Sequence, residues 1–491
     1  MRKIPLILLL LCLFPVLGMA QTLADKVQEY RLENGLTLLM VERTASPTVS
    51  AYISFRVGSA NENSRQRGVA HLLEHMLFKG TKTLGTKDYA AESILLQKIE
   101  QVGGRIDSLK NNPDRDPEEM KALRKQLAEL QEEHRQLVVK DEFSKIYAEN
   151  GGVGYNAFTS KDETAYMIQL PAHKLELWAA IESDRLKNAV LREFYTERDV
   201  VREERRRSYE SNPQGMLYET LLATAYKVHP YRDPIIGWDS DIINLTLAET
   251  REYLHNYYSP VNMVITLVGD FDSNKVKAMV ERYFGTLEPG VPVPRVVDRE
   301  PQQRGERRAR VTFDTAPQIM VAYHKPTMPA PEDYAFDILI QILGEGRTSR
   351  LYQSLVVDQQ LVTDVSIFAA PGSRYDNLLT IMLTPRDSCF CVDVEGALYA
   401  ELEKLKQQPI SDAELKKARR QILTSMLRGM KGNSGLARML SSYEVLGDWK
   451  YLVDYEKQLN SVTAEEVMTV AQTYLQATNR TVVSIGREGF Q

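Results

Sequence analysis

The chain has 491 residues, of which 43% are hydrophobic and 26% charged, and its formal net charge is −5. This balance is typical of a soluble globular protein, and the length is enough for two or three domains. The small negative charge argues against a surface that binds polyanions, and the sequence contains no nucleic-acid-binding motif.

The N-terminal segment is typical of a secretory signal. Arg2 and Lys3 precede an apolar run, residues 4–17, that is too short for a comfortable membrane span. Small residues follow at the positions that cleavage before Gln21 requires. We therefore expect residues 1–20 to be a signal peptide rather than a membrane anchor. The mature chain should be exported without a membrane span, to the periplasm in a bacterium and otherwise out of the cell.

The mature sequence opens with strand patterns. Residues 27–42 hold two alternating apolar runs around the hairpin dipeptide Asn34-Gly35. Residues 49–55 alternate as a half-buried strand does, and helical periodicity begins near Gly68.

The next helix contains HLLEH, residues 71–75. Positions four apart project on nearly the same side of a helix, so His71 and His75 can hold one metal ion, with Glu74 on the same face. Zinc suits two imidazoles and a carboxylate, and it lowers the pKa of a bound water to about 7, whose proton Glu74 could take. The neighbouring apolar residues would bury this helix, where unpaired histidines would be costly. The H-x-x-E-H order is also the inverted metalloprotease motif.

Residues 94–146 are highly charged, with apolar residues at helical and heptad spacing on either side of NNPDRDP, residues 111–117. His134 occupies the one polar core slot of the second run. This pattern predicts a helical hairpin, an antiparallel coiled coil. It could be a partner-binding or gating arm, or a surface excursion without a role.

A third metal ligand is expected in the Glu-rich helical segment 194–210. Glu197 and Glu204 lie seven residues apart, two turns along one face. One could bind the metal while the other supports the ligands without touching it. Such a segment is usually a solvated face, but the histidine pair favours a ligand here. Spacing alone does not exclude the adjacent Glu203.

The C-terminal half looks like a copy of the N-terminal half. Residues 288–310 are rich in proline and charge and predict a linker between residues 21–287 and residues 311–491. Two segments on either side share five residues at a constant offset of 217. These pairs are Thr246 and Thr463, Glu249 and Glu466, Tyr257 and Tyr474, Asn262 and Asn479, and Gly269 and Gly486. The repeat predicts a duplicated domain.

Cys389 and Cys391 are the cysteines left after signal cleavage. The pair could close a small ring or bind a soft metal, or simply be two loop thiols, and we assign it no function.

GVAHLLEHMLFKGT, GGVGYNAFTSKDETAY and ERDVVREE resemble the pitrilysin/insulinase family of zinc metallopeptidases, with a chain length similar to its processing-peptidase-like subfamily. The resemblance covers nearly all of the mature chain, and its first motif is highly specific. It implies an α+β fold of two homologous domains, each an antiparallel sheet with flanking helices. It also implies a closed chamber, formed by two chains or one doubled chain, that admits peptides or unfolded segments. The helical hairpin is an insertion into the first domain.

The resemblance also implies roles for the candidate residues. His71, His75 and Glu204 match the zinc ligands, Glu74 the general base, and Glu197 the supporting glutamate of the catalytic site.

Asn156 and Ala157, in GYNAF, match edge-strand residues that pair with an extended peptide substrate, although Asn156 could also be a turn residue. Main-chain hydrogen bonds would hold the substrate in this mode.

The sequence departs from the family in its C-terminal half. Active members usually carry an Arg and a Tyr seven residues apart that help to hold the substrate carbonyl, and here Val356 and Thr363 stand in their places. Loss of such a donor typically costs about 10²–10³ in rate.

Three hypotheses follow. The first is a zinc endopeptidase that works with a homologous non-zinc subunit carrying the Arg and the Tyr. The second is a self-sufficient homodimeric peptidase, which Val356 and Thr363 disfavour. The third is a non-catalytic scaffold or assembly protein, which the intact H-x-x-E-H motif disfavours.

Overall fold

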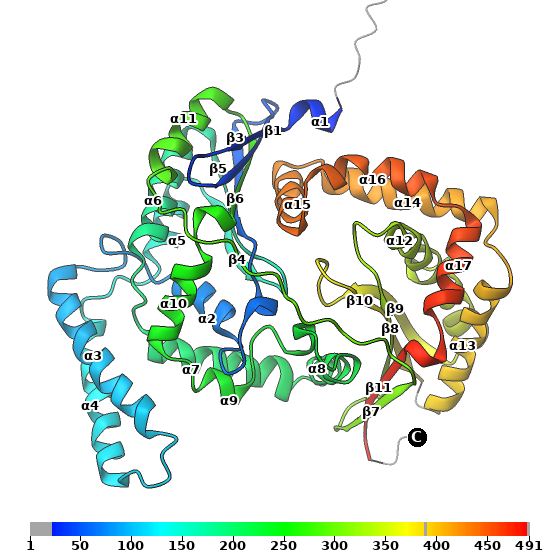
Figure 1. Cartoon of the computed structure of the whole chain (residues 1–491), viewed down its shortest axis with the longest axis horizontal. Helices are drawn as coiled ribbons and strands as arrows, with labels where there is room; N and C mark the ends of the chain where they lie inside the picture. The colour runs from blue at the N-terminus through cyan, green and yellow to red at the C-terminus, as the bar shows by residue number, and fades with distance from the viewer. Residues whose placement is uncertain (1–21, 387–389, 489–491) are drawn as a thin grey trace, which may run out of the picture.

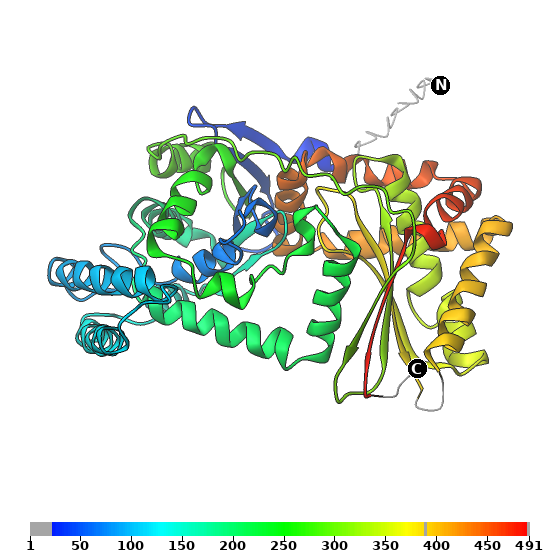
Figure 2. The same ribbon diagram turned by 60° about the horizontal axis from the view of Figure 1, so that its bottom comes forward.

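The computed structural model describes residues 22–386 and 390–488, arranged as two α+β halves side by side (Figure 1; Figure 2). The predicted signal peptide and Cys389 lie outside the described residues. Within the described residues, no helix is both long and apolar enough to cross a membrane.

The first half is built on a six-stranded sheet in the order β1-β2-β6-β3-β5-β4. Its strands are β1 Gln28–Arg31, β2 Thr37–Glu42, β3 Thr48–Phe55, β4 Val153–Thr159, β5 Thr164–Pro171 and β6 Met263–Gly269. The strands pair antiparallel except β2 with β6. The predicted hairpin between β1 and β2 is present, and Gly35 adopts φ +90 in its turn, a conformation that favours glycine.

The second half repeats this order without β1, as β7-β11-β8-β10-β9. Its strands are β7 Arg307–Thr312, β8 Gln318–Lys325, β9 Val362–Ala370, β10 Asn377–Pro385 and β11 Arg480–Gly486. β7 and β11 are parallel, as β2 and β6 are. Because β7 begins at Arg307, residues 307–310 of the predicted linker belong to the second sheet.

The matched residues of the duplication play matching structural roles. Thr246 and Glu249 form a capping box at the start of α10, Leu247–Tyr257, and Thr463 and Glu466 form the same box at the start of α17, Ala464–Tyr474. The Asn262 amide donates to the carbonyl of Tyr257, and the Asn479 amide donates to the carbonyl of Tyr474. The predicted duplication is confirmed because the offset of 217 reproduces the same cap and the same turn.

Each sheet has helices of its own half on one face. The first core joins its sheet to α2 Val69–Met76, α6 Leu175–Asn188, α10 and α11 Ser273–Phe284. The second core joins its sheet to α12 Pro331–Gly344, α13 Cys391–Gln407, α14 Asp412–Gly429, α16 Lys450–Ser461 and α17. Two shorter helices are α1 Leu23–Lys26 and α9 Asp239–Ile242.

The other face of each sheet is covered by a helix of the opposite half (Figure 1). Helix α15, Asn433–Leu446, packs its Leu436 and Leu440 on β2, β3 and β6. Helix α8, Pro213–Ala225, packs its Leu217 and Leu221 on β8, β10 and β11. The two halves are therefore bound together by reciprocal exchange of one helix.

This exchange corrects one expectation, because β3 is buried on both faces instead of one. The polar-side residues Tyr52 and Ser54 lie under α15, where the Tyr52 hydroxyl hydrogen-bonds to Ser434 at 3.1 Å and the Ser54 hydroxyl hydrogen-bonds to Ser441 at 2.8 Å. Alternation in the sequence marked a real difference between the faces, but both faces are covered.

The predicted helical hairpin is formed by α3, Tyr89–Leu109, and α4, Pro117–Arg135, which project from the first half (Figure 1). Buried Val102, Ile106 and Met120 form its small core. The last predicted hairpin residues instead form a separate helix, α5 Glu142–Glu149.

Candidate metal centre

Helix α2 separates its apolar and polar residues cleanly. Leu72, Leu73 and Met76 are fully buried in the first core. The side chains of His71 and His75 keep 14% and 26% of their surface exposed. The motif is therefore partly shielded from water, but its polar groups face a neighbouring helix instead of the core.

That neighbour is α7, Phe194–Arg205, which places Glu204 opposite both histidines. His71 Nε2 lies 3.7 Å from one Glu204 oxygen, and His75 Nε2 lies 3.5 Å from the other. One candidate ligand atom from each of the three side chains falls within 4.8 Å of the other two. Zinc bonds of about 2.0–2.2 Å in a tetrahedron separate ligand atoms by roughly 3.3–3.6 Å. The donor set and its spacing thus fit zinc.

The histidine environments also suit metal binding. Burial, together with the nearby His75, lowers the pKa of His71 to about 3, so this imidazole is neutral at ordinary pH and can offer a lone pair. Burial works against the charged form of His75, but its hydrogen bond to Glu197 and the nearby Glu204 outweigh burial and raise the pKa of His75. The carboxylates of Glu197 and Glu204 would stabilise either a proton or a metal ion bound to His75.

Glu197 and Glu203 occupy different surroundings from Glu204. Glu197 lies 3.4 Å from His75 Nδ1 and accepts a 2.5 Å hydrogen bond from the Lys79 ammonium. Glu203 points away and pairs with Arg206 and Arg207 at 2.7 and 2.9 Å. The geometry therefore separates three glutamates that spacing alone left open: Glu204 faces both histidines, Glu197 contacts one, and Glu203 contacts neither.

Glu74 lies beside the cluster with its own partner. Its Oε2 accepts a 2.5 Å hydrogen bond from the Thr159 hydroxyl at the end of β4. Burial raises the pKa of Glu74, and the Thr159 hydrogen bond opposes that shift. Sequence reasoning missed Thr159 and Lys79 as site residues. Both lie within the motifs that resemble the family, in NAFTS and MLFKG, and this position was the sequence feature that could have identified them.

Asn156 and Ala157 lie in β4, the edge strand of the first sheet. They pair with Met167 and Tyr166 of β5, which leaves the other side of β4 without a strand among the described residues. Asn156 is exposed, whereas Ala157 is buried. Asn156 is therefore a strand residue and not a turn residue, and β4 presents a free edge next to α2.

The positions of the missing Arg and Tyr belong to the second half. Val356 lies in a π-helical turn, Tyr352–Asp358, partly buried against the second core, and the Thr363 hydroxyl donates to the carbonyl of Thr384. The nearby Arg350 is held by Glu414 in two hydrogen bonds of 2.9 and 3.0 Å. Arg350 is thus engaged structurally and does not replace the missing donor.

Comparison with known proteins finds similar sequences and structures. The chain is similar to the zinc protease PqqE of Helicobacter pylori, with 29% identity over 473 residues that cover 94% of each chain. A crystal structure of a protease from Helicobacter pylori covers 94% of this chain and 99% of its own, with a TM-score of 0.79 and 27% identity. The periplasmic protease PqqL from Escherichia coli has the same fold, with a TM-score of 0.69 and 18% identity, and 94% of this chain matches 47% of that longer chain.

Two family models divide the chain between them. Residues 244–422 match the model described as Peptidase M16 inactive domain. Residues 38–115 and 139–239 match the model described as Insulinase (Peptidase family M16). The interruption of this second match, residues 116–138, falls on α4 of the hairpin, whereas α3 lies within the match. The protein belongs to the insulinase family of peptidases, family M16.

Proposed function

We propose that the protein is an exported zinc metalloendopeptidase that cleaves peptides or unfolded protein segments. The observation that carries this proposal is the convergence of His71, His75 and Glu204 at zinc-like spacing, with Glu74 beside them. Zinc bound by these three side chains would act as a Lewis acid and would lower the pKa of a bound water to about 7.

The roles of the chain's own residues follow from their contacts. Glu74 is the general base, and Thr159 fixes its carboxylate through a 2.5 Å hydrogen bond. Glu197 orients the His75 ring through Nδ1, so that Nε2 faces Glu204.

Substrate binding is assigned to the free edge of β4. An extended peptide would pair with the main chain at Asn156 and Ala157 as an added strand. Such pairing needs an unfolded segment, because a folded substrate has no free strand to offer. The closed chamber that the family resemblance implies would likewise admit only peptides or unfolded segments.

The Arg and Tyr expected in this family are assigned to a partner. Val356 and Thr363 have neither the charge nor the hydroxyl reach for that role. We propose a heterodimer with a homologous chain that lacks H-x-x-E-H and carries the pair. A homodimer with altered carbonyl support is the second form of the proposal.

The direct test compares wild type with Glu74→Gln, which keeps the size of the side chain but cannot accept the proton. We expect about one zinc per chain in both proteins, and hydrolysis of unstructured peptides only by wild type, alone or with a partner chain. The matched control is Glu203→Gln, seated outside the cluster. Metal-free wild type after gentle purification, or full activity of Glu74→Gln, would refute the mechanism. Bound zinc without hydrolysis under any pairing would favour a non-catalytic scaffold.

A further inference from the structure

The base of the helical hairpin is anchored by a buried polar cluster. His134 of α4 lies 2.8 Å from Glu92 of α3, and Arg192 holds the same carboxylate through bonds of 2.7 and 3.0 Å. All three side chains are almost inaccessible, with exposures of 2%, 0% and 0%. Burial opposes the charged form of Glu92, but the hydrogen bonds from His134 and Arg192 outweigh it and lower its pKa to about 2. Because the carboxylate is charged at neutral pH, His134 Nε2 is the donor.

The guanidinium of Arg192 also holds the turn that follows α2. It donates to the carbonyls of Lys79 and Thr81, each at 2.7 Å, and more weakly to that of Leu84. The glycine at position 80 makes room for it, because a Cβ there would lie 2.7 Å from Arg192 Nη1. The main chain at Lys79 is therefore fixed through the same carboxylate that His134 holds.

The Lys79 side chain continues these contacts into the metal cluster. Its ammonium lies 2.5 Å from Glu197 and 3.4 Å from Glu193. Glu197 in turn contacts His75 Nδ1 at 3.4 Å. These polar contacts, together with the Lys79 side chain that connects them, thus join the hairpin to His75.

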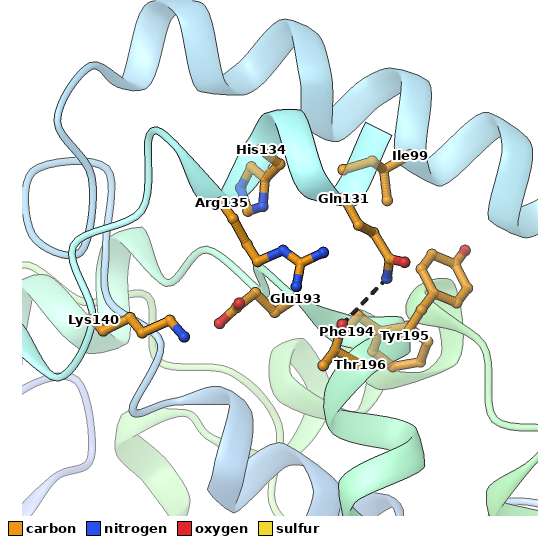
Figure 3. A pocket seen from close by; sticks show the side chains of 9 residues that line it. All are labelled: Ile99, Gln131, His134, Arg135, Lys140, Glu193, Phe194, Tyr195 and Thr196. Carbon is orange, nitrogen blue, oxygen red and sulfur yellow. Dashed lines mark hydrogen bonds between the residues drawn. The ribbon is translucent and has the colours of Figure 1, made fainter. Parts of the chain in front are cut away.

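Side chains of the hairpin also contact α7 directly. Asp107 of α3 pairs with Arg198 at 3.0 Å, and the Gln131 amide of α4 donates to the Thr196 hydroxyl at 3.2 Å. Figure 3 shows the Gln131 contact at the edge of a cavity of about 250 Å³ between the hairpin and the start of α7. Beside these polar contacts, Gly103 of α3 lies directly against the Tyr195 ring of α7, so polar and apolar contacts together hold the hairpin against α7.

We propose that the hairpin α3–α4 positions the metal cluster, and that His134 is the positioning residue on which this depends. The inference rests on the proposed metal site, not on peptide hydrolysis. Loss of the imidazole would remove one of the two donors to the buried Oε1 of Glu92 and leave Arg192 Nε as the other. Glu92 would shift toward other donors, Arg192 would follow, and the turn at Lys79 would no longer hold Glu197 against His75.

The test uses the full mature chain loaded with Co²⁺, whose visible absorption reports ligand geometry. His134→Ala should change the absorption spectrum and weaken metal binding by up to roughly tenfold, below the 10- to 100-fold range typical of a residue that bonds a ligand directly. His134→Gln should restore both, because its amide can still donate to Glu92. His134→Asn, whose amide is too short to reach Glu92, should behave as His134→Ala does and serves if the alanine variant fails to fold.

The matched control is Met120→Ala, which removes a buried side chain near the far end of the hairpin, outside these polar contacts. It should lower the melting temperature and leave the Co²⁺ spectrum and affinity unchanged. A wild-type spectrum and affinity in both His134→Ala and His134→Asn would overturn the proposal, as would an equal change in Met120→Ala. Wild type that binds Co²⁺ but cleaves no peptide would refute the proposed hydrolysis alone, and wild type that binds no Co²⁺ would refute both.

Discussion

Glu203 and Glu204 are neighbours in the sequence but have different partners. Glu204 sits 3.7 and 3.5 Å from the two histidines, whereas Glu203 is held by Arg206 and Arg207 and contacts neither histidine. Successive residues of a helix point about 100° apart, so a shift of one position moves a carboxylate out of the cluster.

At this scale we predict an order of metal affinities among three single substitutions. Glu204→Gln should weaken zinc binding most, because Glu204 is the proposed third ligand. Glu197→Gln should weaken zinc binding by a smaller factor, about 10- to 100-fold, because the residue holds His75 without reaching the metal. Glu203→Gln should leave affinity unchanged. Competition with a chromogenic chelator measures all three, and a larger loss in Glu197→Gln than in Glu204→Gln would mean that the two roles are exchanged.

The sequence identified the residues of this site whose relation is local. His71, Glu74 and His75 share one helical face, which helix periodicity predicts without any tertiary information. The contact between Lys79 and Glu197 spans 118 residues, and that between Thr159 and Glu74 spans 85. Contacts at such separations depend on how α2, β4 and α7 pack, and no period in the sequence encodes that packing.

At the scale of elements, α12 and α16 of the second half enclose an unusual carboxyl group. Asp337 accepts a 2.5 Å hydrogen bond from the Tyr455 hydroxyl. Burial, reinforced by the neighbouring Asp333, raises the pKa of Asp337 to about 7 from an ordinary 3.8. Between these pH values the folded protein retains a proton that the unfolded chain releases, so Asp337 reduces stability progressively as the pH rises.

We therefore predict that Asp337→Asn stabilises the protein in a pH-dependent way. The amide keeps an acceptor for Tyr455 and has no charge to bury. Its advantage over wild type should be small at pH 4, grow up to about pH 7, and stay constant above that. It should not exceed about 4 kcal/mol, at about 1.4 kcal/mol per pKa unit. Thermal melts of both proteins from pH 4 to 8 measure the difference, and parallel curves would contradict the assignment.

Elements were predicted well from the sequence where their pattern is self-contained. The hairpin of β1 and β2, the coiled coil of α3 and α4, and the repeated helix–turn–strand unit each carry their own turn and cap residues. The burial of β3 could not be predicted in the same way. Its second face is covered by α15, which lies nearly four hundred residues further along the chain, as the 387-residue separation of Ser54 and Ser441 records.

At the scale of the whole molecule, the exchange of α8 and α15 makes each half depend on the other. Without α15 the first sheet would expose Leu39, Val41, Tyr52, Val264 and Val268, all buried in the intact chain. A contiguous apolar face of this kind favours aggregation.

We accordingly predict that residues 22–287 alone do not form a stable soluble domain, even though they contain a complete six-stranded sheet. The fragment should aggregate or unfold without a cooperative transition in urea. A fragment that stays monomeric with a sharp transition would show that α15 is dispensable. The intact chain should unfold in a single transition for both halves.

The proposed division of labour between two chains leads to a prediction about mixtures. This chain should cleave unstructured peptides poorly when alone, because Val356 and Thr363 cannot support the substrate carbonyl. A homologous chain with Arg and Tyr seven residues apart should raise turnover about 100-fold or more. Turnover is compared for each chain alone and for the mixture, across several peptides. Equal rates with and without the partner would exclude a shared site.

The exchanged helices also determine what a proteolytic cut between the halves would do. Residues 288–306 form neither helix nor strand and run between the halves. A single proteolytic nick there would leave α8 seated on the second sheet and α15 on the first, so two polypeptides would migrate as one particle. The fragments would separate only in denaturant, and the peptide link between the halves would prove dispensable for holding them together once folding is complete.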